Sequence, residues 1–156
     1  MKHTVIYLLI ICGLSTELSA QFLDTYQWRS RLILLFTPAA DDPLFERQVG
    51  LLRDEVDELR ERDVTVLWIT PDGDRENTGL FLQQSLAQQY YDHFSPRRDI
   101  FELILVGLDG TEKYRASNKD TPPSVLFNLI DEMPMRRQEL RQEYRNKRKT
   151  TKEGGS

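Results

Sequence analysis

Apolar residues occur along this chain in short runs that alternate with amphipathic stretches. Residues 31–37 (RLILLFT) and 64–70 (VTVLWIT) are apolar without alternation, which is typical of strands covered on both faces. Between them, apolar residues recur at steps of three and four over 45–59, and this period predicts a helix. Because a long helical crossover would join the two strands, we expect them to be parallel.

Local signals predict where the helices begin. Asp42 followed by Pro43 is typical of a helix start, with aspartate as the N-cap and proline at the first helical position. After the second strand, residues 71–73 (PDG) predict a turn. Asn77 or Thr78 would then cap a second helix that runs to about residue 93.

The last third of the sequence predicts a hairpin and a final helix. Residues 101–108 and 111–116 flank an Asp-Gly pair, which is a strong hairpin signal. A helix is expected to follow Thr121, with an interruption at Pro134 and a polar helical continuation. The whole order predicts an α/β, thioredoxin-like fold: a mixed four-stranded sheet with helices on both faces and a C-terminal helical extension.

The first twenty residues have the pattern of a secretory signal peptide, with a positive start, an apolar stretch and a small residue before a cut after Ala20. The alternatives are an uncleaved membrane anchor and a lipoprotein with Cys12 as the lipidated residue. We therefore expect an exported protein, periplasmic or extracellular, with a signal peptide at 1–20, a domain at 21–141 and a basic polar tail at 142–156. No transmembrane segment is expected after cleavage.

Cysteine usage limits the chemistry of the exported chain. The single cysteine of the sequence, Cys12, lies in the predicted signal peptide. Thiol exchange, peroxide reduction by a thiolate and cysteine-based zinc sites all require a thiolate. Those functions are excluded for a chain that begins at residue 21.

Charge is unevenly distributed. Residues 136–156 contain eight Lys/Arg and three Glu, a net +5, so residues 21–135 carry −9 within a mature net charge of −4. An acidic body with a basic tail is not typical of nucleic-acid binding, and we expect no nucleic-acid partner. The tail could contact an acidic macromolecule or anionic lipid.

Three stretches resemble the DUF4174 family of thioredoxin/peroxiredoxin-like domains. They are residues 26–43 (YQWRSRLILLFTPAADDP), 101–115 (FELILVGLDGTEKYR) and 129–140 (LIDEMPMRRQEL), the last being the most specific. The resemblance covers about residues 23–141. It implies the fold and an export route, and it implies no particular biochemical activity.

The chain departs from redox-active relatives of this fold at two places. The thioredoxin thiol pair would lie in the turn at 39–42 (AADD), and its cis-proline would lie near Phe101 and Glu102. Aligning Pro38 with the active-site proline of peroxiredoxins places Phe45 at the peroxidatic cysteine. The resemblance therefore implies a redox scaffold without its thiol chemistry.

The carboxyl edge of the sheet is the place where ligands gather in open α/β folds. We expect any small-molecule site there, with Thr37, Asp41, Asp42 and Asp72 as its residues. For Asp42 we favour helix capping. Asp41 is freer to bind a metal or a basic group, but two adjacent carboxylates alone are a weak metal signal, and we predict neither a metal nor a cofactor.

The adjacent pair Arg136 and Arg137 could bind an acidic partner, because guanidinium groups match carboxylates and phosphates. The alternative is that they pair with Asp131, Glu132 or Glu139 within the same segment. Our leading interpretation is an exported, non-catalytic module that binds a protein or another acidic macromolecule of the envelope or extracellular space. The second is a thiol-independent enzyme or metal-binding protein that uses Asp41 and Asp72.

Overall fold

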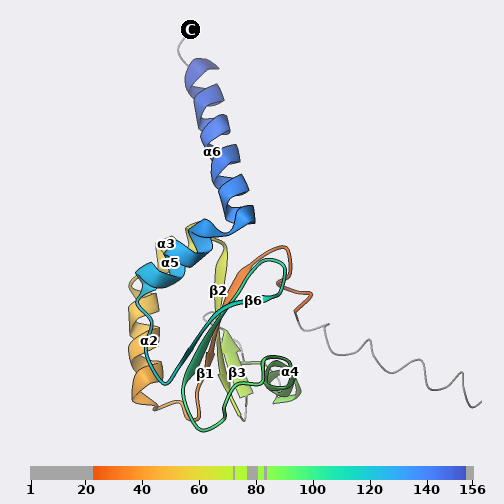
Figure 1. Ribbon diagram of the computed structural model, residues 1–156, viewed down its shortest axis with the longest axis vertical. Coiled ribbons are helices and arrows are strands. Elements are labelled where there is room, and N and C mark those ends of the chain that lie inside the picture. The colour runs from red at the N-terminus through yellow and green to blue at the C-terminus, as the bar shows by residue number, and fades with distance from the viewer. Residues whose placement is uncertain (1–22, 72, 77–80, 83, 154–156) are drawn as a thin grey trace, which may run out of the picture.

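The computed structural model describes residues 23–71, 73–76, 81–82 and 84–153, and it shows an α/β domain built on one mixed sheet (Figure 1). Strand β1 (Arg31–Phe36) lies at the centre of the sheet. It pairs in parallel with β2 (Val64–Thr70) and antiparallel with β5 (Glu102–Val106), which pairs antiparallel with β6 (Glu112–Ser117). The predicted fold class, the parallel pair and the hairpin are thereby confirmed.

The sheet is wider than predicted. Strands β3 (Gly73–Glu76) and β4 (Phe81–Leu82) add an antiparallel hairpin beside β2, and the strand order is β4-β3-β2-β1-β5-β6. Helix α4 (Gln84–Phe94) begins after this hairpin. The predicted caps Asn77 and Thr78 lie outside the described residues.

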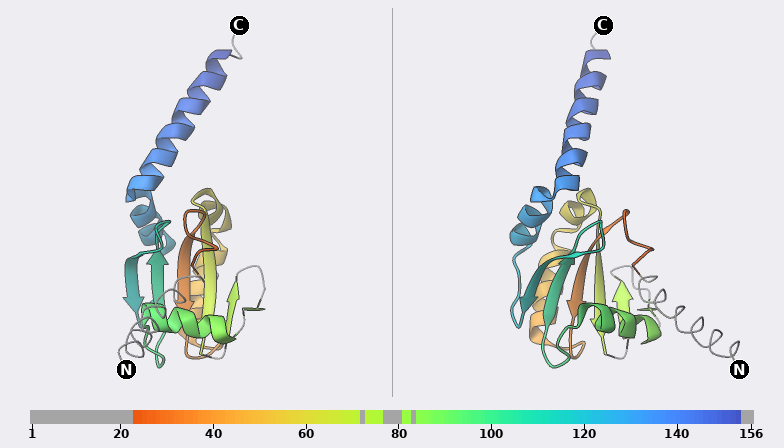
Figure 2. Two further views of the ribbon diagram at one scale, coloured as in Figure 1. Left: turned by 90° about the vertical axis from the view of Figure 1, so that its right-hand side faces the viewer. Right: turned by 45° about the vertical axis from the view of Figure 1, so that its right-hand side comes forward.

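The crossover between β1 and β2 contains two helices where one was predicted. Helix α2 (Pro43–Arg53) has Asp54 as its C-cap, and helix α3 (Val56–Glu61) begins two residues later. Together with α5 (Pro123–Glu132), they cover one face of the sheet, while α4 covers the other face (Figure 2).

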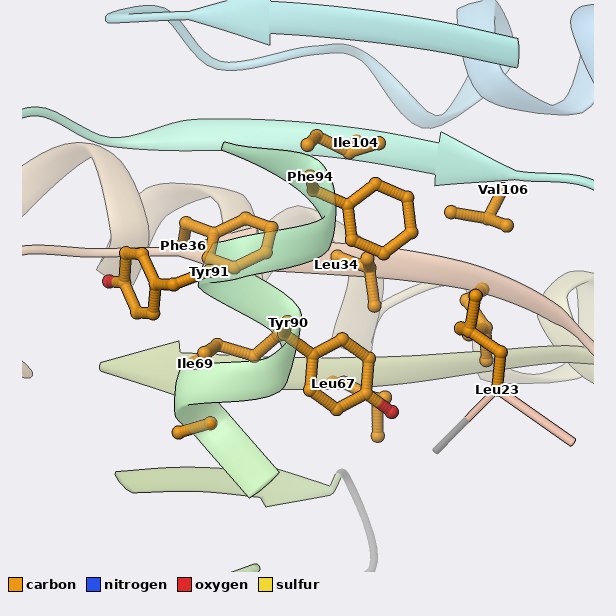
Figure 3. Close-up of a cluster of buried hydrophobic side chains, with 12 residues drawn as sticks. Leu23, Leu34, Phe36, Leu67, Ile69, Tyr90, Tyr91, Phe94, Ile104 and Val106 are labelled. Carbon is orange, nitrogen blue, oxygen red and sulfur yellow. The ribbon is translucent and has the colours of Figure 1, made fainter. Parts of the chain in front are cut away.

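Alternate residues of β1 supply the two halves of the core. Ile33 and Leu35 belong to the buried cluster that also contains apolar residues of α2, α3 and α5. Leu34 and Phe36 belong to the cluster on the other face, where the aromatic rings of α4 pack against them (Figure 3). Both faces of the central strand are thus buried, as its unbroken apolar run predicts.

Helix α6 (Pro134–Glu153) follows α5 after the single residue Met133 and projects away from the sheet in each view (Figures 1 and 2). Pro134 supplies the break, because proline fits the first position of a new helix and disfavours helical geometry at the residue before it. None of the described helices is both long and apolar enough to cross a membrane.

Candidate functional site

The turn between β1 and α2 occupies the place where this fold class usually carries its chemistry. Thr37 continues β1, with its backbone N–H donating to the carbonyl of Ile69 at 3.0 Å. Its side chain is 1% exposed, and Oγ1 donates to the carbonyl of Ala39 at 2.6 Å. The hydroxyl of Thr37 therefore stabilises its own turn and does not face an open site.

The two aspartates of this turn have different roles. Oδ1 of Asp42 accepts hydrogen bonds from the backbone N–H groups of Leu44 and Phe45 at 2.9 and 3.0 Å, which confirms the predicted N-cap. Asp41 is exposed, and Asp72 lies outside the described residues. Within the described part of the chain, no three His, Cys, Asp or Glu side chains converge as a metal site.

Core residues occupy the positions at which thiol-active relatives of the fold place their reactive groups. Phe45 is 8% exposed, and its ring meets that of Trp68 edge-on, with 5.6 Å between the centroids. Glu102 is 3% exposed, and its carboxylate accepts hydrogen bonds from Arg115 at 2.9 Å and Ser117 at 2.8 Å. This edge of the sheet is filled and hydrogen-bonded by the chain itself.

A cluster of buried arginines lies where α3, α5 and α6 meet. Arg136 is 1% exposed, and its guanidinium lies 3.0 Å from Glu61, 3.4 Å from Asp131 and 3.4 Å from Glu139. The pairing of Arg136 with Asp131 and Glu139, which the sequence left open, is confirmed. A partner cannot reach this guanidinium from solvent, and the expectation that Arg136 binds one is corrected.

Two further arginines extend this cluster to the sheet. Arg31, at the start of β1, is 1% exposed and donates from Nη2 to Glu139 and from Nη1 to the carbonyl of Arg62, both at 2.8 Å. Arg62 forms a bidentate pair with Asp131, at 3.1 and 2.8 Å. Burial lowers the pKa of Arg62, but hydrogen bonds to Asp131 and Glu58 outweigh burial and leave the pKa above its ordinary value.

The sequence analysis did not identify Arg31 and Arg62 as members of a network. A signal was present, because arginine is almost never fully buried without a partner and Arg31 begins an unbroken apolar strand. The partner is distant in sequence: Glu139 lies 108 residues further along the chain. A local pattern therefore could not identify it.

A groove lies beside this cluster, at the foot of α6. Its volume is about 360 Å³, and we call it the Trp28 groove; it is lined by Trp28, Arg31, Gly107, Leu108, Asp109, Lys113, Met133, Pro134 and Met135. Two of the lining residues, Asp109 and Lys113, form an ion pair at 2.7 Å. Burial raises the pKa of Asp109, but hydrogen bonds from Lys113 and Thr111 outweigh burial and leave the pKa below its ordinary value.

A basic face on α6 is the second exposed feature. Its members recur at steps of three and four, so they share one side of the helix, and we call them the basic stripe: Arg137, Arg141, Arg145, Arg148 and Lys149. All five side chains are exposed, and none forms an ion pair with another described residue. Arg137, unlike its neighbour Arg136, is thus available to a partner.

Comparison with known proteins identifies a family whose model covers most of the domain. Residues 22–139 match the family model described as "Domain of unknown function (DUF4174)". The chain is 24% identical over 134 residues to coiled-coil domain-containing protein 80 of Danio rerio, covering 76% of this chain and 16% of that protein. It is 30% identical over 133 residues to the Sushi repeat-containing protein SRPX of Rattus norvegicus, covering 78% of this chain and 27% of that protein.

A solved structure supports the fold. The reduced 2-Cys peroxiredoxin of Plasmodium vivax superposes with a TM-score of 0.55 at 14% identity, over 70% of this chain and 68% of that one. The chain itself spans between about a sixth and a quarter of the curated relatives named above. With the family model matched over most of its length, the chain belongs to the DUF4174 family and has a thioredoxin-like fold.

Proposed function

We propose that this protein is an exported, non-catalytic binding module that holds an acidic macromolecule of the envelope or extracellular space through the basic stripe of α6. The observation that carries this proposal is the stripe itself: five exposed cations on one helical face, none of which forms an ion pair within the part of the chain that the structure describes. Unpaired, clustered charge of one sign attracts partners of the opposite sign and speeds their association.

The position and composition of α6 support a macromolecular partner. The helix projects from the body, so the distal turns that carry most of the stripe lie away from the sheet and its helices (Figure 2). Tyr144, 64% exposed, is the most exposed large apolar side chain of the helix, and the ring lies beneath the guanidinium of Arg148 at 5.8 Å. A helix without a broad apolar face is poorly suited to insert into a lipid surface, which favours an acidic protein as the partner.

Export and the absence of catalysis have separate support. The pattern of residues 1–20 is that of a signal peptide, and the chain from residue 21 onward contains no cysteine. At the edge where the fold would carry a reactive group, Thr37 and Asp42 are committed to local hydrogen bonds. These features favour binding over thiol chemistry.

The test is capture of partners from envelope and culture extracts by the full mature chain, over a salt series. The test variant is Arg141→Gln, Arg145→Gln, Arg148→Gln and Lys149→Gln combined, which removes charge while keeping a good helix former at each position. At roughly 0.3–0.5 kcal/mol for each exposed ion pair, we expect about a tenfold loss of capture at low salt.

The matched control removes four exposed cations elsewhere: Arg29→Gln, Arg47→Gln, Arg53→Gln and Lys119→Gln. It changes the net charge by the same amount and should retain capture close to that of the unaltered chain. Equal capture by both variants, or capture insensitive to salt, would contradict the proposal.

A further inference from the structure

A second groove lies on the face of the sheet that α2 and α3 cover, and we call it the α3 groove. Its volume is about 440 Å³, which is near the lower end of ligand sites and suits one or two side chains. Val56 is 49% exposed, so the groove leaves an apolar side chain open to solvent. The lining consists of Arg53 and six apolar residues of α2, α3 and β2: Val49, Leu52, Val56, Leu59, Val66 and Trp68.

Carboxylates flank this exposed valine on both sides. Residues 54–58 read DEVDE, and the whole crossover at 41–63 contains nine Asp/Glu and four Arg, a net −5. Asp54 and Glu55 form no ion pair with any residue that the structure describes. Asp57 pairs with Arg60 on the surface, where such a pair contributes little. An occupant of the α3 groove is therefore expected to be basic as well as apolar.

Helix α6 combines these two properties. Leu140 and Tyr144 are 37% and 64% exposed, and they lie on the same side of the helix because they are four residues apart. Arg137, Arg141 and Arg148 of the basic stripe each lie three or four residues from one of these two side chains. The outer part of α6 thus presents a narrow apolar ridge, Leu140 and Tyr144, flanked by cations.

Within one molecule the ridge and the groove do not meet, because no residue of α6 lines the α3 groove. Arg136, in the first turn of α6, is bound to Glu61 of α3 and Asp131 of α5, and from there the helix leads away from the sheet (Figures 1 and 2). The ridge is therefore available to another molecule. Residues 136–156 carry a net +5 and the crossover a net −5, so two copies of the chain match in the sign and the amount of charge.

We propose that the α3 groove binds helix α6 of a second copy of this chain. Leu140 and Tyr144 of the second copy pack against Val56 and Trp68, and its basic stripe lies along the carboxylates of residues 54–58. An amphipathic helix in a groove takes its affinity from such apolar anchors and its register from the charges around them. The inference rests on the proposed function, because it identifies another copy of this chain as an acidic partner of the basic stripe.

The experiment is sedimentation velocity of the full mature chain over a series of protein concentrations, at low and at high salt. We expect reversible self-association at low salt, with a dissociation constant that rises about tenfold at high salt because exposed charges are screened. A chain that remains monomeric at millimolar concentration and low salt would overturn the inference.

Two variants test the two sides of the contact. The stripe variant carries the four glutamines in α6 described above. The groove variant combines Asp54→Asn, Glu55→Gln and Asp57→Asn, and it removes no capping bond, because the side chain of Glu55 does not cap α3. Each variant should raise the dissociation constant about tenfold or more, and Tyr144→Ser should raise it several-fold.

The matched control for the groove variant combines Asp24→Asn, Asp92→Asn and Asp99→Asn, which removes three exposed carboxylates elsewhere. It changes the net charge by the same amount and should self-associate like the unaltered chain. Circular dichroism of every variant should match that of the unaltered chain. Equal weakening in the control and the groove variant would show that net charge, and not the α3 groove, governs association.

Mixing the two variants is the decisive measurement. The stripe variant keeps the carboxylates at its groove, and the groove variant keeps its basic helix, so one contact can form between them. The mixture should therefore form a complex that neither variant forms alone. A mixture that stays monomeric, or a groove variant that associates as strongly as the unaltered chain, would refute the docking of α6 in the groove.

Capture from envelope and culture extracts separates this inference from the proposed function. If the chain is monomeric and the stripe variant loses capture, the inference is wrong and the proposed function stands. If the chain self-associates as expected and captures nothing else, the inference stands and the proposal of a further partner fails. If the stripe variant retains both self-association and capture, both are wrong.

Discussion

Single residues of this domain divide into those that a local pattern identifies and those that depend on distant partners. Asp42 belongs to the first kind, because capping involves only the next three residues. Arg136 belongs to the second kind. Glu61, its nearest carboxylate, lies 75 positions earlier in the chain, so the sequence around Arg136 suggested an exposed pair of arginines.

At this scale we predict that Arg136→Met destabilises the domain by about 1–2 kcal/mol, because a buried guanidinium that joins α6 to α3 and α5 is lost, while the carboxylates left behind remain partly exposed to water. Urea unfolding should show a lower midpoint with an unchanged slope. The control is Arg137→Met, whose side chain is exposed and should change stability by less than about 0.5 kcal/mol. Similar losses in the two variants would show that burial of Arg136 is not what stabilises this region.

At the scale of elements, the central strands and the hairpin could be predicted, while two features could not. The split between α2 and α3 is hidden because the apolar period continues through Leu52, Val56 and Leu59 across the break. Strand β3 (GDRE) contains no apolar residue, so no alternation marks it as a strand. Pairing with β2 forms this strand, and pairing is not visible in a local window.

The start of α2 gives a prediction for an element. Asp42→Ala removes the acceptor for two backbone N–H groups and should cost about 1 kcal/mol of unfolding free energy. Thermal and urea denaturation would measure it. Asp41→Ala, at the exposed neighbour, should be close to neutral, and a larger loss there would indicate a role that the capping geometry does not explain.

For the whole molecule, the fold could be predicted because two parallel apolar strands, a helical crossover and a hairpin allow few arrangements. The candidate site could be predicted only in part. The sequence pointed to the carboxyl edge of the sheet and to the C-terminal arginines, and it gave no reason to select Trp28. The groove depends on the approach of three segments, around Trp28, the hairpin tip and Pro134, that are far apart along the chain.

The cysteine content gives a prediction that tests the proposed export. Purified from its natural host, the protein should contain no titratable thiol and should have an intact mass that begins at Gln21. It should also show no insulin-reducing activity, because no thiolate is available. One thiol per chain would mean that the leader is retained, and reductase activity lost on Cys12→Ser would refute the non-redox account.

The bridge from Arg31 to Glu139 sets the shortest length of chain that should fold independently. A version shortened to the end of α5 would retain every strand but would leave the buried guanidinium of Arg31 without Glu139, whereas Arg62 would keep Glu58 and Asp131. The first turns of α6 are therefore part of the autonomous folding unit, and only the distal turns form an appendage. A shortened version for crystallography should consequently stop beyond Glu143, which is the last carboxylate within 4 Å of an arginine in this cluster.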